Sequence, residues 1–449
     1  MKRALILICL LSLTICLMIS CATSADGAMI GEEIVKSQLK SGNNSGAVQT
    51  VKKYKSNYKD AVVYYLDAGL TNFYAGNFKE ATDNLSQAER TIEENKTKSI
   101  SQGIASYLVN DNVRDYPGTL YEDVVTNIMS SLAYLNSGNL EDALVEVKRA
   151  NIKLVDYEIN VKDQESGLLD LVFVFTKNPW TYLPVLDDVQ SYNYSPLATY
   201  ISMLLYNLDG DSDNAAVDYR KMVSKGSAVN SISEEDYNIP KGKGRLNVIS
   251  FEGLIGQKIE RSAYGSSILG SRTVSHKIAW PWISLGSDTN VRSVIVKVDG
   301  RSFKLDVVED FTQDAIENLH MDIKSTYLRS FYRGLMKMKA AIEVATKTSS
   351  EAKKATSNIS NPLMKGLANA GIDTAINKAI NEVNESEKAD TRMGNYLPDQ
   401  ASIGGITLDP GTYQVEVVYE FKDYGSYSRN FTVEIEEGKN TIITSSCAR

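Results

Sequence analysis

The chain has 449 residues, of which 43% are hydrophobic and 23% charged, and its formal net charge is −8. This length exceeds what a single hydrophobic core usually serves, so we expect two or three domains. The acidic balance argues against nucleic acid as a partner and against a basic surface for anionic lipid, and 2 histidines leave little room for acid–base or metal chemistry.

Residues 1–20 have the character of a secretory signal, because Lys2 and Arg3 precede an uncharged and mainly apolar run. The run ends in Leu-Met-Ile-Ser-Cys, which resembles a bacterial lipobox, a motif in which the cysteine receives diacylglycerol and becomes the new N-terminus. We therefore expect a signal peptide over 1–20, a lipid on Cys21 and a tether over 21–29. Secretion without a lipid is the alternative, because Met18 stands where Leu is usual.

This expectation determines which cysteines the mature chain would keep. Cys9 and Cys16 would leave with the signal, and the mature chain would keep only Cys21 and Cys447. With Cys21 lipidated, no internal disulfide can form, although the compartment would permit one. No later run of 18 apolar residues occurs, so we expect no transmembrane helix.

One sequence phrase recurs along residues 30–227: a glycine, an alanine five residues later, and then further small or apolar residues at helical spacing. The first two copies begin 34 residues apart, which is the period of the tetratricopeptide repeat. We expect each glycine in the turn between two antiparallel helices, and each alanine where the helix backbones approach most closely. The four copies contain Gly42 and Ala47, Gly76 and Ala81, Gly138 and Ala143, and Gly210 and Ala215.

Two longer segments interrupt these repeats, at 99–118 and 160–196, so we expect a distorted solenoid. Trp180 and Tyr182 in the second segment could contact a ligand. The alternative is that this aromatic pair closes the end of a helical stack.

From residue 240 the pattern changes to strand-like runs with alternating apolar residues. Asp299-Gly300 predicts a hairpin turn between two of these runs. The expected strands cover 246–251, 258–262, 273–282, 294–298, 302–308, 413–421, 431–435 and 441–444.

Helical spacing returns between these strands. Residues 314–346 carry one apolar stripe, with acidic residues early and basic residues late, as the helix dipole favours. Residues 347–358 indicate a mobile segment or a frayed helix end, and 363–383 a second helix. We therefore predict an α+β chain: a tetratricopeptide-like all-α region at 30–227, followed by a β-rich, sandwich-like domain at 240–449 with a helical insertion at about 312–385.

The chain as a whole resembles a family of bacterial tetratricopeptide-containing lipoproteins. The resemblance covers nearly all of the mature chain and implies an envelope location and this architecture, but no activity. It rests on the lipobox, residues 134–139 running into 146–151, Asn178-Pro179, residues 277–281, and residues 389–392 before Leu397-Pro398. Asp390 and Arg392 could form a site, or an ion pair that ties the helical insertion to the sheet.

No catalytic pattern emerges from the rest of the chain. Residues 241–245 lack the spacing of a phosphate-binding loop and lead into a strand, so we interpret them as a solvated linker. Neither His276 nor His320 has a recognisable nucleophile nearby in the sequence, and no cysteine pair offers zinc ligands.

These observations favour a protein that is not an enzyme, has no cofactor, and is anchored in the cell envelope, most simply at the outer membrane. We expect it to act as a scaffold that holds an unidentified envelope protein in the concave groove of its repeats. The alternative is an envelope hydrolase or a solute-binding lipoprotein that uses a cleft between the two halves. An open groove lined by polar and aromatic side chains would favour the scaffold, and a closed pocket holding His276 or Asp390 would favour the alternative.

Overall fold

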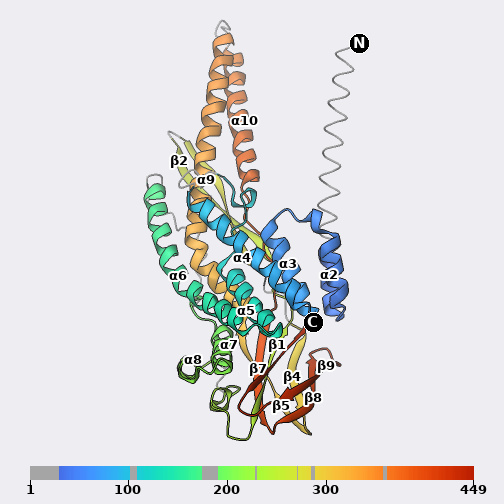
Figure 1. The fold of residues 1–449 in the computed structure, drawn as a ribbon. Helices are drawn as coiled ribbons and strands as arrows, with labels where there is room; N and C mark the ends of the chain where they lie inside the picture. The colour runs from blue at the N-terminus through green and yellow to red at the C-terminus, as the bar shows by residue number, and fades with distance from the viewer. Residues whose placement is uncertain are drawn as a thin grey trace.

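The computed structural model confirms a mixed α+β chain, in which an N-terminal helical region is followed by β-sheets (Figure 1). The expected signal peptide and tether, and Cys21 with them, lie outside the described residues, as do Trp180 and Tyr182. The structure describes residues 30–101, 109–173, 191–227, 230–269, 272–284, 289–356 and 362–449.

The helical region is built from consecutive helix pairs. The first pair is the helix over residues 30–40 with α2, and three further pairs follow. Their helices are α2 (Asn44–Lys53), α3 (Ala61–Tyr74), α4 (Phe78–Ser101), α5 (Leu120–Asn136), α6 (Leu140–Phe173), α7 (Pro196–Leu208) and α8 (Ser212–Lys225).

The four pairs share one turn. Gly42, Gly76, Gly138 and Gly210 all have positive φ, from +78° to +83°, a left-handed conformation that favours glycine at the end of a helix. In each turn, the backbone N–H of the residue after the glycine bonds to a carbonyl five residues earlier, as Asn77 N does to Asn72 O at 2.9 Å. The residue after the glycine is Asn or Asp at all four positions, which suits the start of the next helix.

The alanine of each copy lies at the contact within its pair. Ala47, Ala81, Ala143 and Ala215 are all 0% exposed. Any larger side chain at these positions would have to displace the neighbouring helix.

The described residues contain ten strands, which form two four-stranded sheets and one hairpin. We call the sheet ordered β10-β1-β7-β6 the inner sheet, and the sheet ordered β5-β4-β8-β9 the outer sheet; β2 and β3 pair only with each other. The strands are β1 (Gly244–Glu252), β2 (Lys258–Leu269), β3 (Arg272–Ile283), β4 (Val291–Val298), β5 (Arg301–Lys304), β6 (Asp306–Asp310), β7 (Gln400–Leu408), β8 (Gly411–Phe421), β9 (Ser426–Ile435) and β10 (Asn440–Cys447).

The inner sheet is covered on both faces. Leu246 and Val248 of β1 pack into a core with the outer sheet. Ile249 and Phe251 point the other way, into the core of the helical region, where the Phe251 ring lies 6.0 Å from that of Phe73. The helices and the inner sheet therefore share one continuous hydrophobic core, and the outer sheet completes a sandwich behind it.

The expected single strand at 302–308 is wrong. Residues 301–304 belong to the outer sheet as β5, and residues 306–310 belong to the inner sheet as β6. Leu305, which is 2% exposed, lies in the core between the sheets at the crossing point. Apolar and polar residues alternate from Ser302 to Val307, so the pattern at the crossing point carries no sign of the change. The pairing register shifts only afterwards, between Val307, which is 50% exposed, and Glu309.

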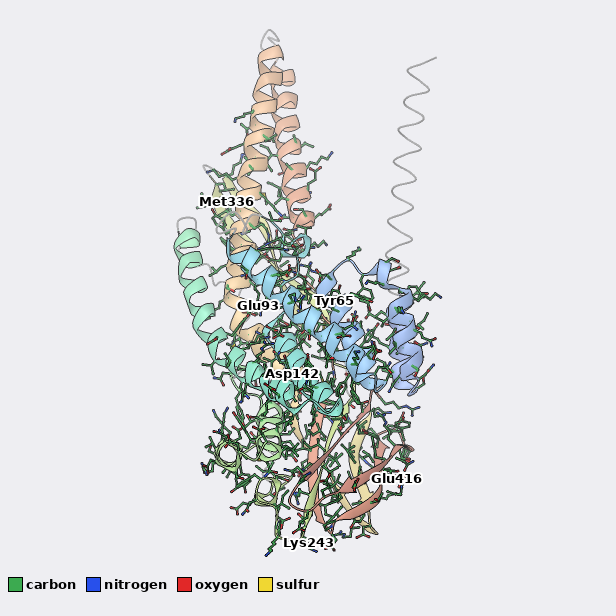
Figure 2. The ribbon with its side chains drawn as sticks, viewed as in Figure 1. Tyr65, Glu93, Asp142, Lys243, Met336 and Glu416 are labelled. Carbon is green, nitrogen blue, oxygen red and sulfur yellow. The ribbon has the colours of Figure 1, made fainter. Side chains whose placement is uncertain are left out.

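The helical insertion consists of α9 (Phe311–Thr356) and α10 (Pro362–Ser386), which pack against each other and project away from the sandwich (Figure 1). The segment expected to be mobile or frayed from 347 continues α9 as far as Thr356, and 357–358 lie outside the described residues. Figure 2 shows Met336 at the base of this projection and Lys243, from the expected linker, at the opposite end of the molecule.

Candidate functional site

The inner face of the helical region, where a partner was expected, is filled by the chain itself. The inner sheet and α9 cover α3, α5 and α7, and the segment that connects α10 to β7 runs across α3 and α5. We call residues 387–399 the connecting segment. The inner face of the helical region therefore lies inside the protein, so a partner that binds this region needs another surface.

The connecting segment is held by a buried carboxylate on α3. Asp67 is 0% exposed, and its Oδ1 accepts the backbone N–H of Asn395 at 2.7 Å. Its Oδ2 accepts the side-chain amide of Asn395 at 2.7 Å and the hydroxyl of Tyr58 at 2.9 Å. Burial raises the pKa of Asp67 to about 7, against the lowering effect of these three hydrogen bonds.

A second buried carboxylate, that of Glu122 on α5, holds the connecting segment at Gly394, one residue before Asn395. Glu122 is 0% exposed, and it accepts the backbone N–H of Gly394 at 2.8 Å and that of Thr119 at 2.9 Å. It also accepts the hydroxyl of Tyr116. Lys258, whose side chain is 2% exposed, donates to Tyr116 Oη at 2.8 Å and lies 3.9 Å from Glu122.

Asp390 and Arg392, the candidate motif of the connecting segment, form an ion pair with Nη2–Oδ2 and Nε–Oδ1 distances of 2.8 and 2.9 Å. The Arg392 guanidinium also contacts Asp60 at 3.1 Å and lies over the ring of Tyr116, 4.9 Å from its centroid. It further donates to the backbone carbonyls of Asp111 and Arg114. The pair thus joins the exit of the helical insertion to the helical region, and not to the sheet as expected.

An open groove lies beside this network. Its empty volume is about 1750 Å³, counting the solvent at its mouth, and it runs between the first two helices, the start of α3, residues 112–115 and the connecting segment. Tyr54, Tyr58 and Tyr396 supply aromatic rings, and Val113 at the rim is 71% exposed. The charged lining residues are Glu32, Lys59, Asp60, Arg114, Asp115, Lys258 and Arg392. Mixed charges with tyrosines and valines suit a polypeptide surface better than a small apolar ligand.

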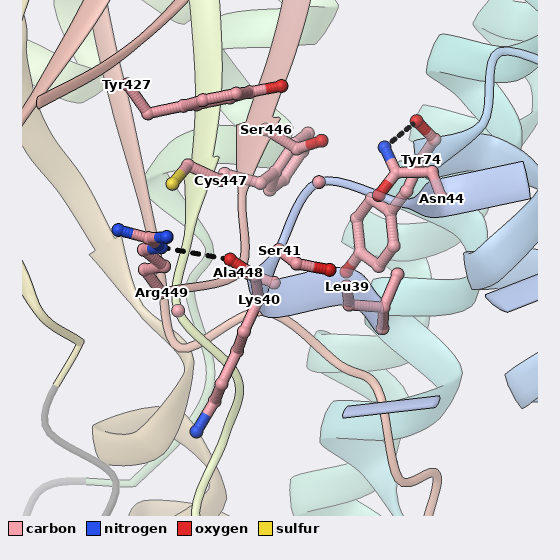
Figure 3. A pocket seen from close by; sticks show the side chains of 13 residues that line it. Leu39, Lys40, Ser41, Asn44, Tyr74, Tyr427, Ser446, Cys447, Ala448 and Arg449 are labelled. Atoms are coloured by element: carbon pink, nitrogen blue, oxygen red, sulfur yellow. Dashed lines mark hydrogen bonds between the residues drawn. The ribbon is translucent and has the colours of Figure 1, made fainter. Parts of the chain in front are cut away.

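A smaller pocket, with an empty volume of about 470 Å³ that includes the solvent at its mouth, lies between the turn after residue 40 and the end of β10 (Figure 3). Arg449 Nε donates to the carbonyl of Lys40 at 3.0 Å, and Asn44 Nδ2 donates to that of Tyr74 at 2.6 Å. Cys447 lines this pocket as a buried free thiol whose pKa is raised by burial. The Arg449 contact ties the residues after β10 to the first helix pair, and the Asn44 contact ties α2 to α3.

The histidines lie elsewhere. His276 of β3 is 0% exposed, packs edge-on against Phe331 at 4.6 Å, and is not among the residues that line the groove. Burial lowers its pKa to about 4, so the ring is neutral at physiological pH. His320 lies on α9 and is half-buried. Within the described residues, no group of three or more His, Cys, Asp or Glu side chains is placed to hold a metal ion.

Sequence reasoning missed the polar residues that organise this region. Asp67 is the only charged residue in the apolar α3, and this isolation is a local signal that the carboxylate has a buried partner.

Glu309 and Asp314 form another buried acidic pair, at the N-terminus of α7. Glu309 accepts hydrogen bonds from Ser195 Oγ at 2.7 Å and from Leu197 N at 2.8 Å. Burial raises the pKa of both carboxyls, that of Glu309 to about 7 and that of Asp314 well above its ordinary value, and so favours the protonated form of each.

Neither a protein-family model nor a curated protein sequence matches the chain. Among the helices that the structure describes, none combines the length and the apolar character needed to cross a lipid bilayer.

Proposed function

We propose that the protein is a lipid-anchored scaffold of the cell envelope, without catalytic activity, whose helical region is a tetratricopeptide-like stack. The four Gly-Asn or Gly-Asp turns share a left-handed glycine and the same hydrogen-bond pattern, and each is followed by a fully buried alanine; these features support the repeat assignment. Stacks of this kind bind polypeptides by shape and need no reactive side chains.

The open groove is the observation that carries the proposal. The inner face of the helical region is filled by the sheet, α9 and the connecting segment, so the proposal assigns the partner to a surface that remains accessible. The groove is such a surface, with tyrosines on its walls and exposed valine and charged residues on its rim. Tyrosine in a polar surround is typical of protein–protein contacts.

The alternative of a hydrolase or a solute-binding protein has less support. Lys258 and Arg392, two of the basic residues that line the groove, are engaged in internal hydrogen bonds that hold the connecting segment. The neutral His276 is enclosed between β3 and α9 and lines no part of the groove.

The anchor is tested by Cys21→Ser. Only a thiol can take diacylglycerol, so we expect wild-type mature protein in the detergent phase of a phase partition and the variant in the aqueous phase. Wild-type protein recovered in the aqueous phase would show that no lipid is attached.

The groove is tested by site-specific photo-crosslinking in envelope preparations. A photoreactive residue at position 113, on the groove rim, should give a discrete adduct with one partner protein. The same residue at position 155, where Val155 of α6 is 64% exposed outside the groove, is the matched control. Equal labelling at the two positions, or no adduct at 113, would contradict the groove as the partner site.

A further inference from the structure

The β2–β3 hairpin lies apart from the two four-stranded sheets, beside α9 (Figure 1). It is a sheet of two strands, so each strand has one neighbour and one outward edge among the described residues. The backbone groups along an outward edge must find partners in the same chain, in water or in another molecule.

The outward edge of β3 is closed by side chains of the helical insertion. The backbone N–H of Lys277 donates to Asn384 Oδ1 at 2.8 Å, and that of Ala279 donates to Ser330 Oγ at 2.8 Å. Pro281 is the next residue of β3 whose backbone points outward, so the N–H that proline lacks would not have bonded to β2.

These bonds identify the outward groups of β2. In an antiparallel ladder, residues opposite each other both point their backbone groups inward or both point them outward. Lys277 is opposite Tyr264 and Ala279 is opposite Ser262, so the outward set on β2 is Ser262, Tyr264, Ser266 and Ile268. No hydrogen bond from these four backbones to any described residue outside the hairpin occurs.

The same four residues form the exposed face of the hairpin. Tyr264 is 56% exposed and Ile268 is 69% exposed, whereas Gly265 and Ser267 face α9 and are buried. The run 262–268 contains no proline and no charged residue, the two usual means of keeping an exposed edge from pairing. By contrast, the exposed face of the edge strand β9 carries only polar side chains, and Arg429 of β9 bonds to Ser446 of β10.

We propose that a second copy of this chain pairs with the β2 edge, strand to antiparallel strand, about a two-fold axis at Gly265. This register places Tyr264 opposite Ser266 of the second copy, and Ser262 opposite its Ile268. A large side chain then always faces a small one, and all four outward residues exchange backbone hydrogen bonds. Arg261 falls opposite Leu269, so no like charges meet. The strand is thus complementary to itself, as an isologous dimer requires.

The first experiment is sedimentation equilibrium of the full mature chain with Cys21→Ser, over about 1–100 μM, the range in which a modest interface dimerises. We expect a concentration-dependent dimer. Tyr264→Lys places a charge on the shared edge, and Ser266→Pro removes an outward N–H while leaving the β2–β3 ladder intact. Each should weaken dimerisation by roughly tenfold or more. Val155→Lys, at an equally exposed position on α6, should leave the dimer unchanged.

Melting temperature and circular dichroism establish that each variant is folded. The register is tested by mixing a Tyr264→Cys chain with a Ser266→Cys chain under mild oxidation, with the buried Cys447 present in both. A disulfide that forms faster in the mixture than in either chain alone supports the proposal. A wild-type chain that remains monomeric, a dimer insensitive to both edge variants, or equal disulfide formation in all three samples would overturn it. The proposal is independent of the groove, since crosslinking at 113 tests a different surface.

Discussion

Replacing Asp67 by Asn should change how the stability of the protein depends on pH. Asp67 is fully buried, and its pKa rises from 3.8 to about 7 on folding. A carboxyl with a raised folded-state pKa contributes stability that is complete below its unfolded pKa and is lost as the pH rises through its folded pKa. Each tenfold change in proton affinity corresponds to about 1.4 kcal/mol. Linkage then gives a loss of roughly 2–3 kcal/mol from this residue between pH 5 and pH 8.

The assay is urea unfolding of wild type and Asp67→Asn at pH 5, 6, 7 and 8. The asparagine keeps an acceptor for the backbone N–H of Asn395. Its NH2 group, however, faces two other donors, the Tyr58 hydroxyl and the Asn395 side-chain amide, and this mismatch costs about 1 kcal/mol at every pH. Glu252 and Glu309 also contribute to the pH dependence of the wild-type free energy of unfolding, because burial raises their pKa values to about 8 and about 7. Only the difference between the two proteins isolates Asp67, and it should move by about 2–3 kcal/mol in favour of the variant from pH 5 to pH 8. A difference that stays constant with pH would refute the assignment of a neutral carboxyl to this site.

Three further predictions concern packing and connectivity. Ala81→Leu and Ala143→Leu overfill fully buried helix contacts and should each lower the free energy of unfolding by about 1–3 kcal/mol, whereas Leu at the exposed Ala340 should change it by only tenths. Arg333 of α9 is buried and donates to both carboxylate oxygens of the buried Glu387, so Arg333→Met leaves that carboxylate without its main partner and should cost about 3–5 kcal/mol, measured by chemical denaturation; a cost below about 1 kcal/mol would show that the pair is hydrated. Limited proteolysis between 226 and 244 should cut the chain while the two fragments still elute together on gel filtration, because they share one core; separate elution without denaturant would contradict that shared core.

The local features of this fold follow from its sequence. The phrase that begins with Gly76 and Ala81 predicted a turn and a close helix contact, and the structure has a left-handed glycine and a fully buried alanine at those positions. Both are consequences of steric rules that act within a few residues of the chain. For the same reason, Asp299-Gly300 correctly predicted the hairpin between β4 and β5.

The distant contacts could not be predicted in this way. Asp67 and Asn395 are 328 residues apart in the chain, and no periodicity in either segment indicates the other. The burial of the inner face of the helical region depends on such contacts. The open groove is also a product of them, since its walls come from the first helices, the loop after α4 and the connecting segment.

The position of β1 has a consequence for how the chain reaches its folded state. β1 lies between β7, which begins at Gln400, and β10, which pairs with it in parallel and ends at Cys447. No hydrogen-bonding neighbour of β1 is therefore present until nearly the whole chain has been synthesised, and the helices must wait equally long for the apolar face that covers them. A topology dominated by contacts of this range folds slowly. The lipoprotein proposal entails export through a membrane pore as an extended polypeptide, and slow folding is compatible with it, because early formation of a stable core would block the passage.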